Sequence, residues 1–269
     1  MGVIGFFAKK YIPPVPPTPT NDFSGDSNCV AVYNVDDGAA LLLDSQNSFD
    51  LRHVVAGTVN NTTYYKQGDA SVECDSGTGY IGIDVPQQDS TWPGAIGSGN
   101  TLLTCCYWVR FTSLAVNAFQ HYKGAVCKFT SGKGQFAMHS GHGSTHKPAI
   151  WMGSGNGSTY QQGTSVGDPV YDDIWYHFAG TINGTTGAYR LRIWDDSIGA
   201  AMDLNGLGGD LTGTFTNTPG IILDTEDASL HIGNMTVYTH IGQIDEVVIF
   251  NRIISVAEIN NIRAGTFGA

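Results

Sequence analysis

Two arginines and a tryptophan alternate with apolar residues along one short stretch of the chain, and their chemistry suits a sugar ligand. In the segment from Tyr189 to Trp194, Arg190, Arg192 and Trp194 occupy every second position. In a β-strand these three side chains would share one face, with the apolar residues between them facing the core. Aromatic rings stack on the apolar faces of pyranoses while polar groups satisfy the hydroxyls, so we predict glycan binding at Arg190, Arg192 and Trp194. Trp151 is a further candidate ring, and the alternative for both tryptophans is a place in the core.

A glycan-cleaving enzyme would need acidic residues at a suitable spacing. Retaining glycoside hydrolysis uses two carboxyl groups about 5 Å apart, which alternate positions on one strand would supply. The pairs Glu226-Asp227 and Asp245-Glu246 are adjacent instead, so in a regular strand their side chains would point to opposite faces. The sequence also has no G-x-S-x-G motif for a serine nucleophile. We predict that the chain is not an enzyme. A glycan hydrolase or lyase of the same fold remains an alternative, placed third after the two non-enzymatic functions given at the end of this section.

The end of the chain shows which elements would position these residues. The segment from Ile244 to Phe250 is β-branched, apolar and short, which indicates a strand buried on both sides. Ser255 and Glu258 have the spacing of a capping box, and Gly265 can end the helix that follows. One short helix therefore closes a β-rich chain.

Several segments, taken in chain order, resemble one family. They are Val30–Gly38 with Leu43–Asn47, Gly68–Asp75, Leu103–Phe111, Trp175–Thr181 with Tyr189–Trp194, and His240–Arg252. Together they resemble the laminin G-like, concanavalin A-like lectin and glucanase domains. The resemblance implies an all-β fold, an antiparallel β-sandwich of jelly-roll type with one short C-terminal helix. Cys74 replaces the Phe that is usual in the family, and Asp195-Asp196-Ser197 replaces a D-G turn.

The same resemblance implies a structural calcium ion under the edge of the sandwich. In the family the Asp of the I-D-E strand binds the ion together with carbonyl groups near the opening loops, which implicates Asp245. The resemblance also implies Asp44 and Asp69 as further candidates behind Asp245, and Ca²⁺ prefers oxygen ligands from loops. The alternative is that Asp245 only accepts hydrogen bonds from a neighbouring loop.

Composition argues against several partners and compartments. The 269 residues include 24 Asp and Glu but only 13 Lys and Arg, a formal charge of −11, and we expect no nucleic-acid partner because phosphate binding needs clustered cations. No stretch approaches the ~20 apolar residues of a membrane span. The five cysteines include the adjacent Cys105 and Cys106, so we expect free buried thiols and folding in a reducing cytosol. Two lysines follow the apolar N-terminal residues instead of preceding them, which disfavours a secretory signal.

The first 24 residues form a segment of different character from the sandwich domain expected at residues 25–269. This segment contains five of the ten prolines, which indicates an extended polyproline-like arm that cannot form a core of its own. We expect Phe6, Phe7, Tyr11 and Ile12 to dock on another protein or on another copy of the chain.

The arm, the cytosolic folding and the lectin-like domain together suggest a setting. We predict a structural protein of a bacteriophage virion, as a head decoration, tail or fibre component, made in the host cytoplasm and displayed on the virion surface. There it would contact other virion proteins or its own copies and bind host-surface or environmental glycans. The alternative is a carbohydrate-binding module or adhesin that a bacterium exports to its surface or surroundings.

Overall fold

The structure is a computed structural model of the whole chain. The residues that it describes are 21–36, 43–46, 49–51, 53–54, 58–74, 81–83, 92–93, 101–113, 123–130, 133–140, 145–153, 160–216, 230–235 and 238–268. Phe6, Phe7, Tyr11 and Ile12 of the predicted arm lie outside these residues. Within the described part of the chain, no helix is long and apolar enough to cross a membrane.

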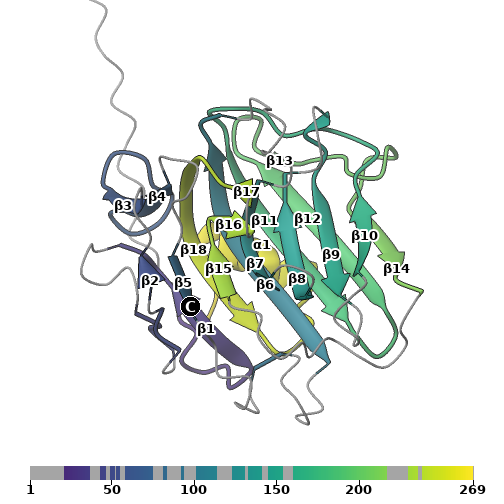
Figure 1. Cartoon of the computed structure of the whole chain (residues 1–269), viewed down its shortest axis with the longest axis horizontal. Helices are drawn as coiled ribbons and strands as arrows, with labels where there is room; N and C mark the ends of the chain where they lie inside the picture. Colours follow the sequence, from purple (N-terminus) through teal and green to yellow (C-terminus); the bar gives the residue numbers. More distant parts are fainter. Residues whose placement is uncertain are drawn as a thin grey trace, which may run out of the picture.

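Two antiparallel sheets face each other and make the sandwich (Figure 1). The larger has nine strands: β1 (Cys29–Tyr33), β3 (Thr58–Asn61), β4 (Ser71–Cys74), β6 (Leu102–Phe111), β11 (Trp175–Asn183), β12 (Ala188–Asp195), β13 (Ala200–Ala201), β14 (Leu211–Thr214) and β18 (Gly242–Phe250). Their order is β13-β12-β11-β6-β18-β4-β3, with β1 paired to β18 and β14 paired to β12. The predicted antiparallel β-sandwich is confirmed.

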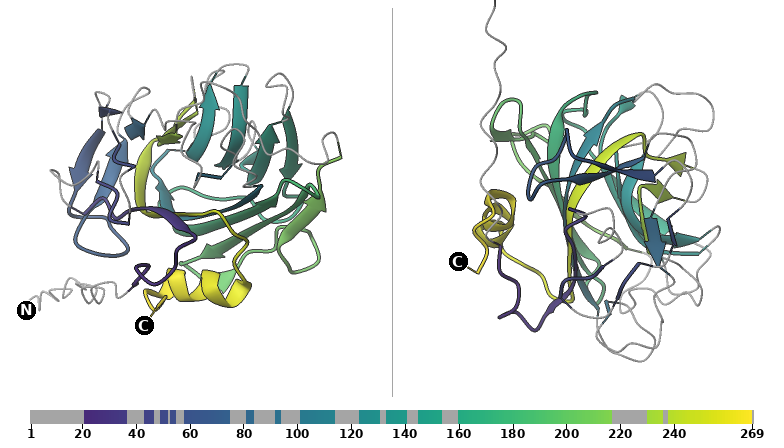
Figure 2. Two further views of the ribbon diagram at one scale, coloured as in Figure 1. Left: turned by 90° about the horizontal axis from the view of Figure 1, so that it is seen from below. Right: turned by 90° about the vertical axis from the view of Figure 1, so that its left-hand side faces the viewer.

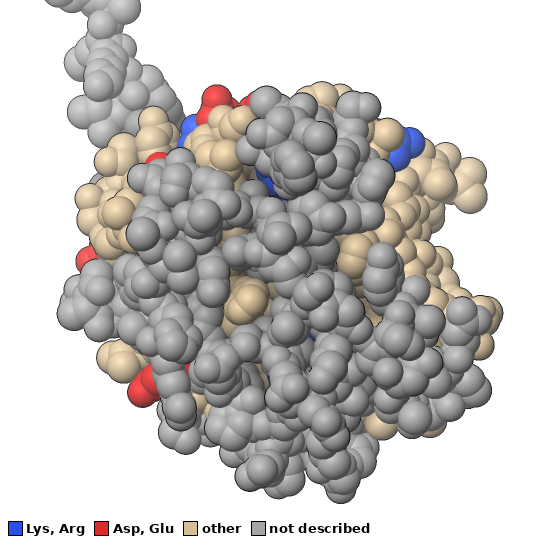
Figure 3. Space-filling view, viewed as in Figure 1, with Lys and Arg blue, Asp and Glu red and all other residues tan. Residues whose placement is uncertain are grey.

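The second sheet has seven strands. They are β2 (His53–Val54), β5 (Ile81–Ile83), β7 (Gly124–Thr130), β8 (Lys133–His139), β9 (Ala149–Gly153), β10 (Tyr160–Thr164) and β15 (Leu230–Ile232), in the order β10-β9-β8-β7-β15-β5-β2. A separate hairpin joins β16 (Asn234–Met235) to β17 (Tyr238–Thr239). Few of the described residues visible over the seven-stranded sheet are charged (Figure 3).

The main core lies between the two sheets, and strand β12 shows how the sequence builds it. Leu191 and Ile193 are fully buried in this core, as the alternating pattern predicts. Arg190, Arg192 and Trp194 lie on the opposite, outer face of the nine-stranded sheet and are half-buried. Each inward apolar residue therefore leaves a polar or amphipathic neighbour outside.

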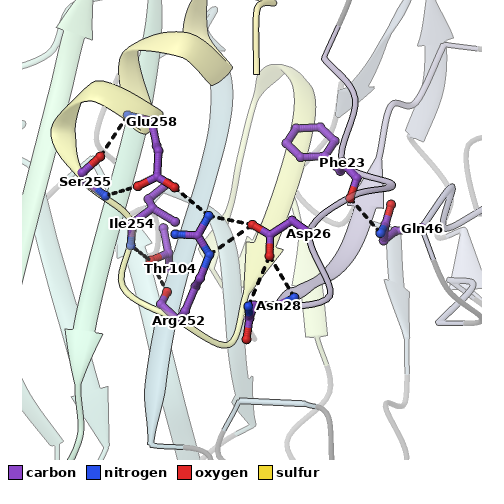
Figure 4. Close-up of polar contacts among 9 residues, drawn as sticks. All are labelled: Phe23, Asp26, Asn28, Gln46, Thr104, Arg252, Ile254, Ser255 and Glu258. Atoms are coloured by element: carbon purple, nitrogen blue, oxygen red, sulfur yellow. Dashed lines mark hydrogen bonds and ion pairs between the residues drawn. The ribbon is translucent and has the colours of Figure 1, made fainter. Parts of the chain in front are cut away.

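Helix α1 (Val256–Ala264) begins and ends where the sequence predicts. The Ser255 hydroxyl accepts a hydrogen bond from the Glu258 backbone N–H, and the Glu258 carboxylate accepts one from the Ser255 N–H (Figure 4). Gly265 ends the helix in the left-handed conformation, with φ of 72°. Arg252 lies between Asp26 and Glu258 and donates to each over 2.6 Å, which attaches the helix start to the opening segment (Figure 4).

A second apolar cluster fixes α1 on the outer face of the nine-stranded sheet (Figure 2). Ile259 and Ile262 of the helix are buried there against residues of β1, β6, β11 and β18. Phe23 stacks on Phe267 with ring centroids 5.0 Å apart, and Phe250 lies edge-on to Phe23. The helix therefore covers one part of this face.

Strand β18 is buried along its whole length, as predicted, but it is not regular. Its pairing with β6 shifts register between Asp245 and Val248, and Glu246 has a positive φ of 48°. A bulge of this kind breaks the alternation of side chains. The strand is therefore not regular at Asp245 and Glu246, so the alternation expected for a regular strand does not apply there. Burial raises the pKa of Glu246, and the Asp245 carboxylate raises it further.

All five cysteines are buried and free, as predicted. Cys105 and Cys106 face opposite sides of the nine-stranded sheet, the first in the main core and the second under the helix. Burial raises the pKa of both thiols, so they act as small apolar residues.

Candidate functional site

A groove of about 510 Å³ lies on the outer face of the nine-stranded sheet, beside the region that the helix covers. Its polar wall comes from β11, β12 and β14, and Ile253, which precedes the helix, forms an apolar side. The polar side chains that line it are Thr181, Asn183, Arg190, Thr212 and Thr214. No Asp, Glu or His is among the described residues that line it.

The register of three neighbouring strands places the groove residues in rows. Thr181 lies opposite Arg190, and Arg190 lies opposite Thr212. In the next row Ala188 lies opposite Thr214. A cationic side chain is thus flanked on both sides by threonines, while the small side chain of Ala188 leaves room beside them.

The floor of the groove is supported from the core side by Tyr189. Its ring stacks on Phe215 with centroids 4.2 Å apart. A Cβ atom added at Gly163 or at Gly213 would lie 2.5 Å from this ring. The absence of side chains at these two glycines therefore lets the ring fill the space below β12 and β14, which makes the floor rigid.

The two arginines on the outer face of β12 have different partners. Arg192 donates from Nη1 to Oδ1 of Asp210 over 2.7 Å. Nε of Arg190 is 3.6 Å from Oδ2 of the same carboxylate, too far for a hydrogen bond. Asp210 therefore holds Arg192 firmly and Arg190 only loosely.

Trp194 belongs to an aromatic row that crosses the sheet. Trp194 lies opposite His177, and His177 lies opposite Trp108, edge to face at 5.1 Å. The guanidinium of Arg263 covers Trp194 at 3.7 Å, and the ammonium of Lys66 covers Trp108 at 4.7 Å. The tryptophan faces outward as predicted, but a guanidinium from the helix end lies on its ring, so its role in glycan binding stays a prediction.

His177 of this row stays neutral. Burial, together with the positive charges of Arg263 and Arg192, lowers its pKa to about 3. A charged imidazole is therefore excluded at neutral pH, and the row is an apolar, cation-covered surface.

The structure corrects the role predicted for Trp151 as an exposed ring. Its side chain is only 3% exposed, in a small cluster with Cys127, Ala137 and Ala149. The His139 ring meets it edge to face at 5.0 Å. Local pattern could not distinguish this burial from exposure, because the covering residues are distant in sequence.

Asp44, one of the predicted calcium ligands, organises its own loop. Its Oδ1 accepts the backbone N–H groups of Val32 and Gln46, both at 2.9 Å, and its Oδ2 accepts that of Phe49. Both oxygens are therefore used by the backbone. Asp69 is exposed, and its backbone N–H donates to the Asp36 carboxylate.

Asp245 has the role given above as the alternative, at least in part. Its Oδ2 accepts the backbone N–H groups of Lys66 at 2.7 Å and Gln67 at 3.0 Å, while no described residue donates a hydrogen bond to Oδ1. Burial raises the pKa of Asp245 to about 8, although the two N–H groups act against it. In the described part of the chain, no three His, Cys, Asp or Glu side chains gather as a metal site. Calcium binding by Asp245, Asp44 or Asp69 stays a prediction from sequence.

Comparison with known proteins gives a fold but no family. No protein-family model matches the chain, and no curated protein matches it. One similar solved structure is domain 4 of AbnA, a GH43 extracellular arabinanase from Geobacillus stearothermophilus, in complex with arabinotriose. The TM-score is 0.58 at 15% identity, over 88% of this chain and 98% of that one.

Two other similar structures belong to longer chains. The binding domain of botulinum neurotoxin DC in complex with SialylT has a TM-score of 0.58 at 13% identity, over 90% of this chain and 52% of that one. A Trypanosoma rangeli sialidase in complex with sialic acid has a TM-score of 0.53 at 10% identity, over 90% of this chain and 33% of that one. This chain therefore spans about half of the neurotoxin domain. At these identities the likeness shows a shared β-sandwich fold.

Sequence reasoning found Arg190 but not the rest of the groove. Thr212 and Thr214 lie in a short strand whose L-T-G-T sequence is too polar and too short to stand out. Their alternation with Leu211 and Phe215, both buried, was the available signal. Asp210 and Ile253 reach the site only through tertiary pairing, which no local pattern shows.

Proposed function

We propose that this chain is a carbohydrate-binding β-sandwich protein that holds a glycan in the groove beside Arg190 and does not cleave it. The observation that carries the proposal is the groove itself, where hydroxyl, amide and guanidinium groups lie beside the apolar side chain of Ile253. Sugar sites combine a few polar groups that fix orientation with apolar contacts to the ring.

The chemistry of the lining supports binding without catalysis. Glycoside hydrolysis needs a general acid and a second carboxylate on either side of the scissile bond. The described residues that line the groove supply neither, and the nearby carboxylate of Asp210 is paired with Arg192. The printed names of the similar structures also favour a sugar ligand, since they include arabinotriose and sialic acid complexes.

The proposal can be tested with a glycan array and titration calorimetry. The double variant Thr212→Val and Thr214→Val removes two exposed hydroxyls at nearly constant shape. We expect it to weaken glycan binding about thirtyfold, because each of the two hydrogen bonds contributes about 1 kcal/mol. Thr164→Val, an exposed threonine of β10 in the other sheet, is the matched control and should bind as the wild type does.

Two results would contradict the proposal. Release of reducing ends from a bound polysaccharide would identify an enzyme. No binding across a broad array of glycans would leave the groove without a sugar ligand.

For the biological setting, the proposal from sequence is a virion surface protein attached through residues 1–24. The proline content of the arm supports it, as do the five free buried thiols, which suit assembly in a reducing cytosol. The similar structures suggest no virion role, and the alternative of an exported carbohydrate-binding module fits their names better.

Deletion of residues 1–20 separates these settings. If the arm is an assembly element, the truncated protein should melt at the wild-type temperature but fail to join a particle or oligomer. The Asn21 side chain bonds to Gln67 and Ile262, and this cut keeps both contacts. Normal assembly of the truncated protein would rule out the arm as the attachment.

A further inference from the structure

Arg190 is the one charged side chain among the described residues that line the groove, and its ion pair with Asp210 is a long one. Its side chain is 38% exposed. None of the described residues accepts a hydrogen bond from its Nε, and the nearest carboxylate oxygen, on Asp210, is 3.6 Å away. Nε itself is buried, so the exposed part of this side chain, which lines the groove, is what a ligand would meet.

Other arginines on this sheet donate short hydrogen bonds to side chains of the protein. Arg192 donates to Asp210, and Arg252 donates to both Asp26 and Glu258. Arg110 likewise donates to Gln243 over 2.7 Å and is paired with an aspartate. Arg190 therefore differs from these structural arginines, because no carboxylate of a described residue lies within hydrogen-bond distance of its Nε. An acceptor group of a ligand could pair with it instead.

The neighbours of Arg190 narrow the chemistry of that group to an anion. Thr181 and Thr212 lie opposite it on the two adjacent strands, which puts a threonine on each side of Arg190. A carboxylate accepts two parallel N–H bonds from the planar fork of a guanidinium and has lone pairs left for hydroxyl donors. The overall charge of −11 does not forbid this, because exposed charges are screened beyond about 8 Å at physiological salt.

We propose that the groove selects acidic glycans, with a sugar carboxylate bound by the Arg190 guanidinium between Thr181 and Thr212. Ile253 then contacts an apolar patch of the sugar ring. This inference rests on the proposed function, because it names the class of glycan that the same groove takes. A carboxylate in this place also leaves the pair between Arg192 and Asp210 intact.

The test uses matched pairs of oligosaccharides, each a uronic-acid oligomer and its fully methyl-esterified form. Esterification removes the charge and keeps the sugar backbone. By calorimetry at low salt, we expect the full-length protein to bind the acid form at least about tenfold more tightly than the ester. The difference should shrink as salt increases.

Three variants locate the effect. Arg190→Gln should abolish the preference for the acid form, and Arg190→Lys should keep part of it, since a lysine retains the charge but not the fork. Lys147→Gln is the control, because it removes the same charge at an exposed site whose ammonium bonds only to a backbone carbonyl, that of Val166. It should leave the preference unchanged.

The outcomes separate this inference from the proposed function. Equal binding of acid and ester in every pair would overturn the acidic class and leave a neutral-glycan domain. A preference that survives Arg190→Gln would place the carboxylate elsewhere and also overturn the inference. If no glycan of any kind binds, the proposed function itself fails.

Discussion

The outer face of the nine-stranded sheet contains two regions that are built on the same strands but differ in almost every property. Where α1 lies, Ala179 and Phe250 face an apolar cluster and are fully buried. Two residues further along β11 the outward position is Thr181, and from there the face is polar and forms the groove. Two residues along β11, from Ala179 to Thr181, therefore separate the surface that packs against the helix from the surface that forms the groove.

Their arginines differ in the same way. Arg252, beside the helix, donates hydrogen bonds to two carboxylates, whereas Arg190, in the groove, has no hydrogen bond to a described residue from its Nε. An arginine that stabilises the fold is paired with carboxylates of the protein itself. An arginine that binds a ligand is instead available for pairing with an acidic group of that ligand.

Phe250→Ala should have the largest effect, and only on the covered region. The ring contacts Phe23 and Phe267 with centroids 6.0 and 5.8 Å away, and its removal leaves a cavity. We expect a loss of about 3–5 kcal/mol in the free energy of unfolding, measured by urea denaturation. Glycan affinity, measured where the variant is still folded, should not change; a parallel loss of affinity would show that the two regions are coupled.

Replacement of each arginine by methionine sharpens the comparison. Arg252→Met removes hydrogen bonds to Asp26 and Glu258 that are partly shielded from solvent. It should cost about 1–3 kcal/mol in the free energy of unfolding. Arg190→Met should change that free energy by less than about 0.5 kcal/mol. If both variants lose similar stability, Arg190 is a structural residue after all.

The smallest effect concerns pH and the buried acids of β18. Burial raises the pKa of Asp245 to about 8 and that of Glu246 well above its usual value, so the folded state keeps protons that the unfolded state releases. The free energy of unfolding should therefore fall as pH rises from about 4 towards 8. His177 and His240, with pKa values lowered to about 3, act in the opposite direction below about pH 6.5.

Between pH 6.5 and 8 only the acids contribute, and we expect a fall on the order of 1 kcal/mol. Asp245→Asn should reduce it, as measured by thermal melts across this range. Calcium would have the opposite signature, because a bound ion favours the ionised carboxylate. If Asp245 binds calcium, a chelator should lower the melting temperature and Asp245→Asn should remove this sensitivity. Identical melting curves with chelator and with excess calcium would exclude such a site.

Sequence alone predicted the parts of this fold that depend on local rules. Ser255, Glu258 and Gly265 define a helix through capping contacts three or four residues apart, and the structure contains all of these contacts. The alternation from Arg190 to Trp194 likewise gave the correct faces, because a strand fixes side-chain direction with a period of two.

The parts that sequence could not provide depend on contacts between distant segments. Arg263, which covers Trp194, comes from a helix much later in the chain. Trp151 is buried by its surroundings rather than by its own pattern. The left-handed conformation of Glu246 needs a bulge against β6, which an apolar strand sequence does not reveal.

The two ends of the described chain lie side by side, and this arrangement has a mechanical consequence. The Asp22 N–H donates to the Phe267 carbonyl over 2.7 Å, and the Phe267 N–H donates to the Asn21 side chain over 2.8 Å. Tension between these ends would break the hydrogen bonds of Asn21 and Asp22 with Phe267 one after another, without loading many strand–strand hydrogen bonds at the same time. The contact of Phe23 with Phe267 would open first, and α1 would peel from the sheet before any strand of the sandwich carried load. The terminal segment would then extend at a lower force than the sheets, and both sheets would stay folded.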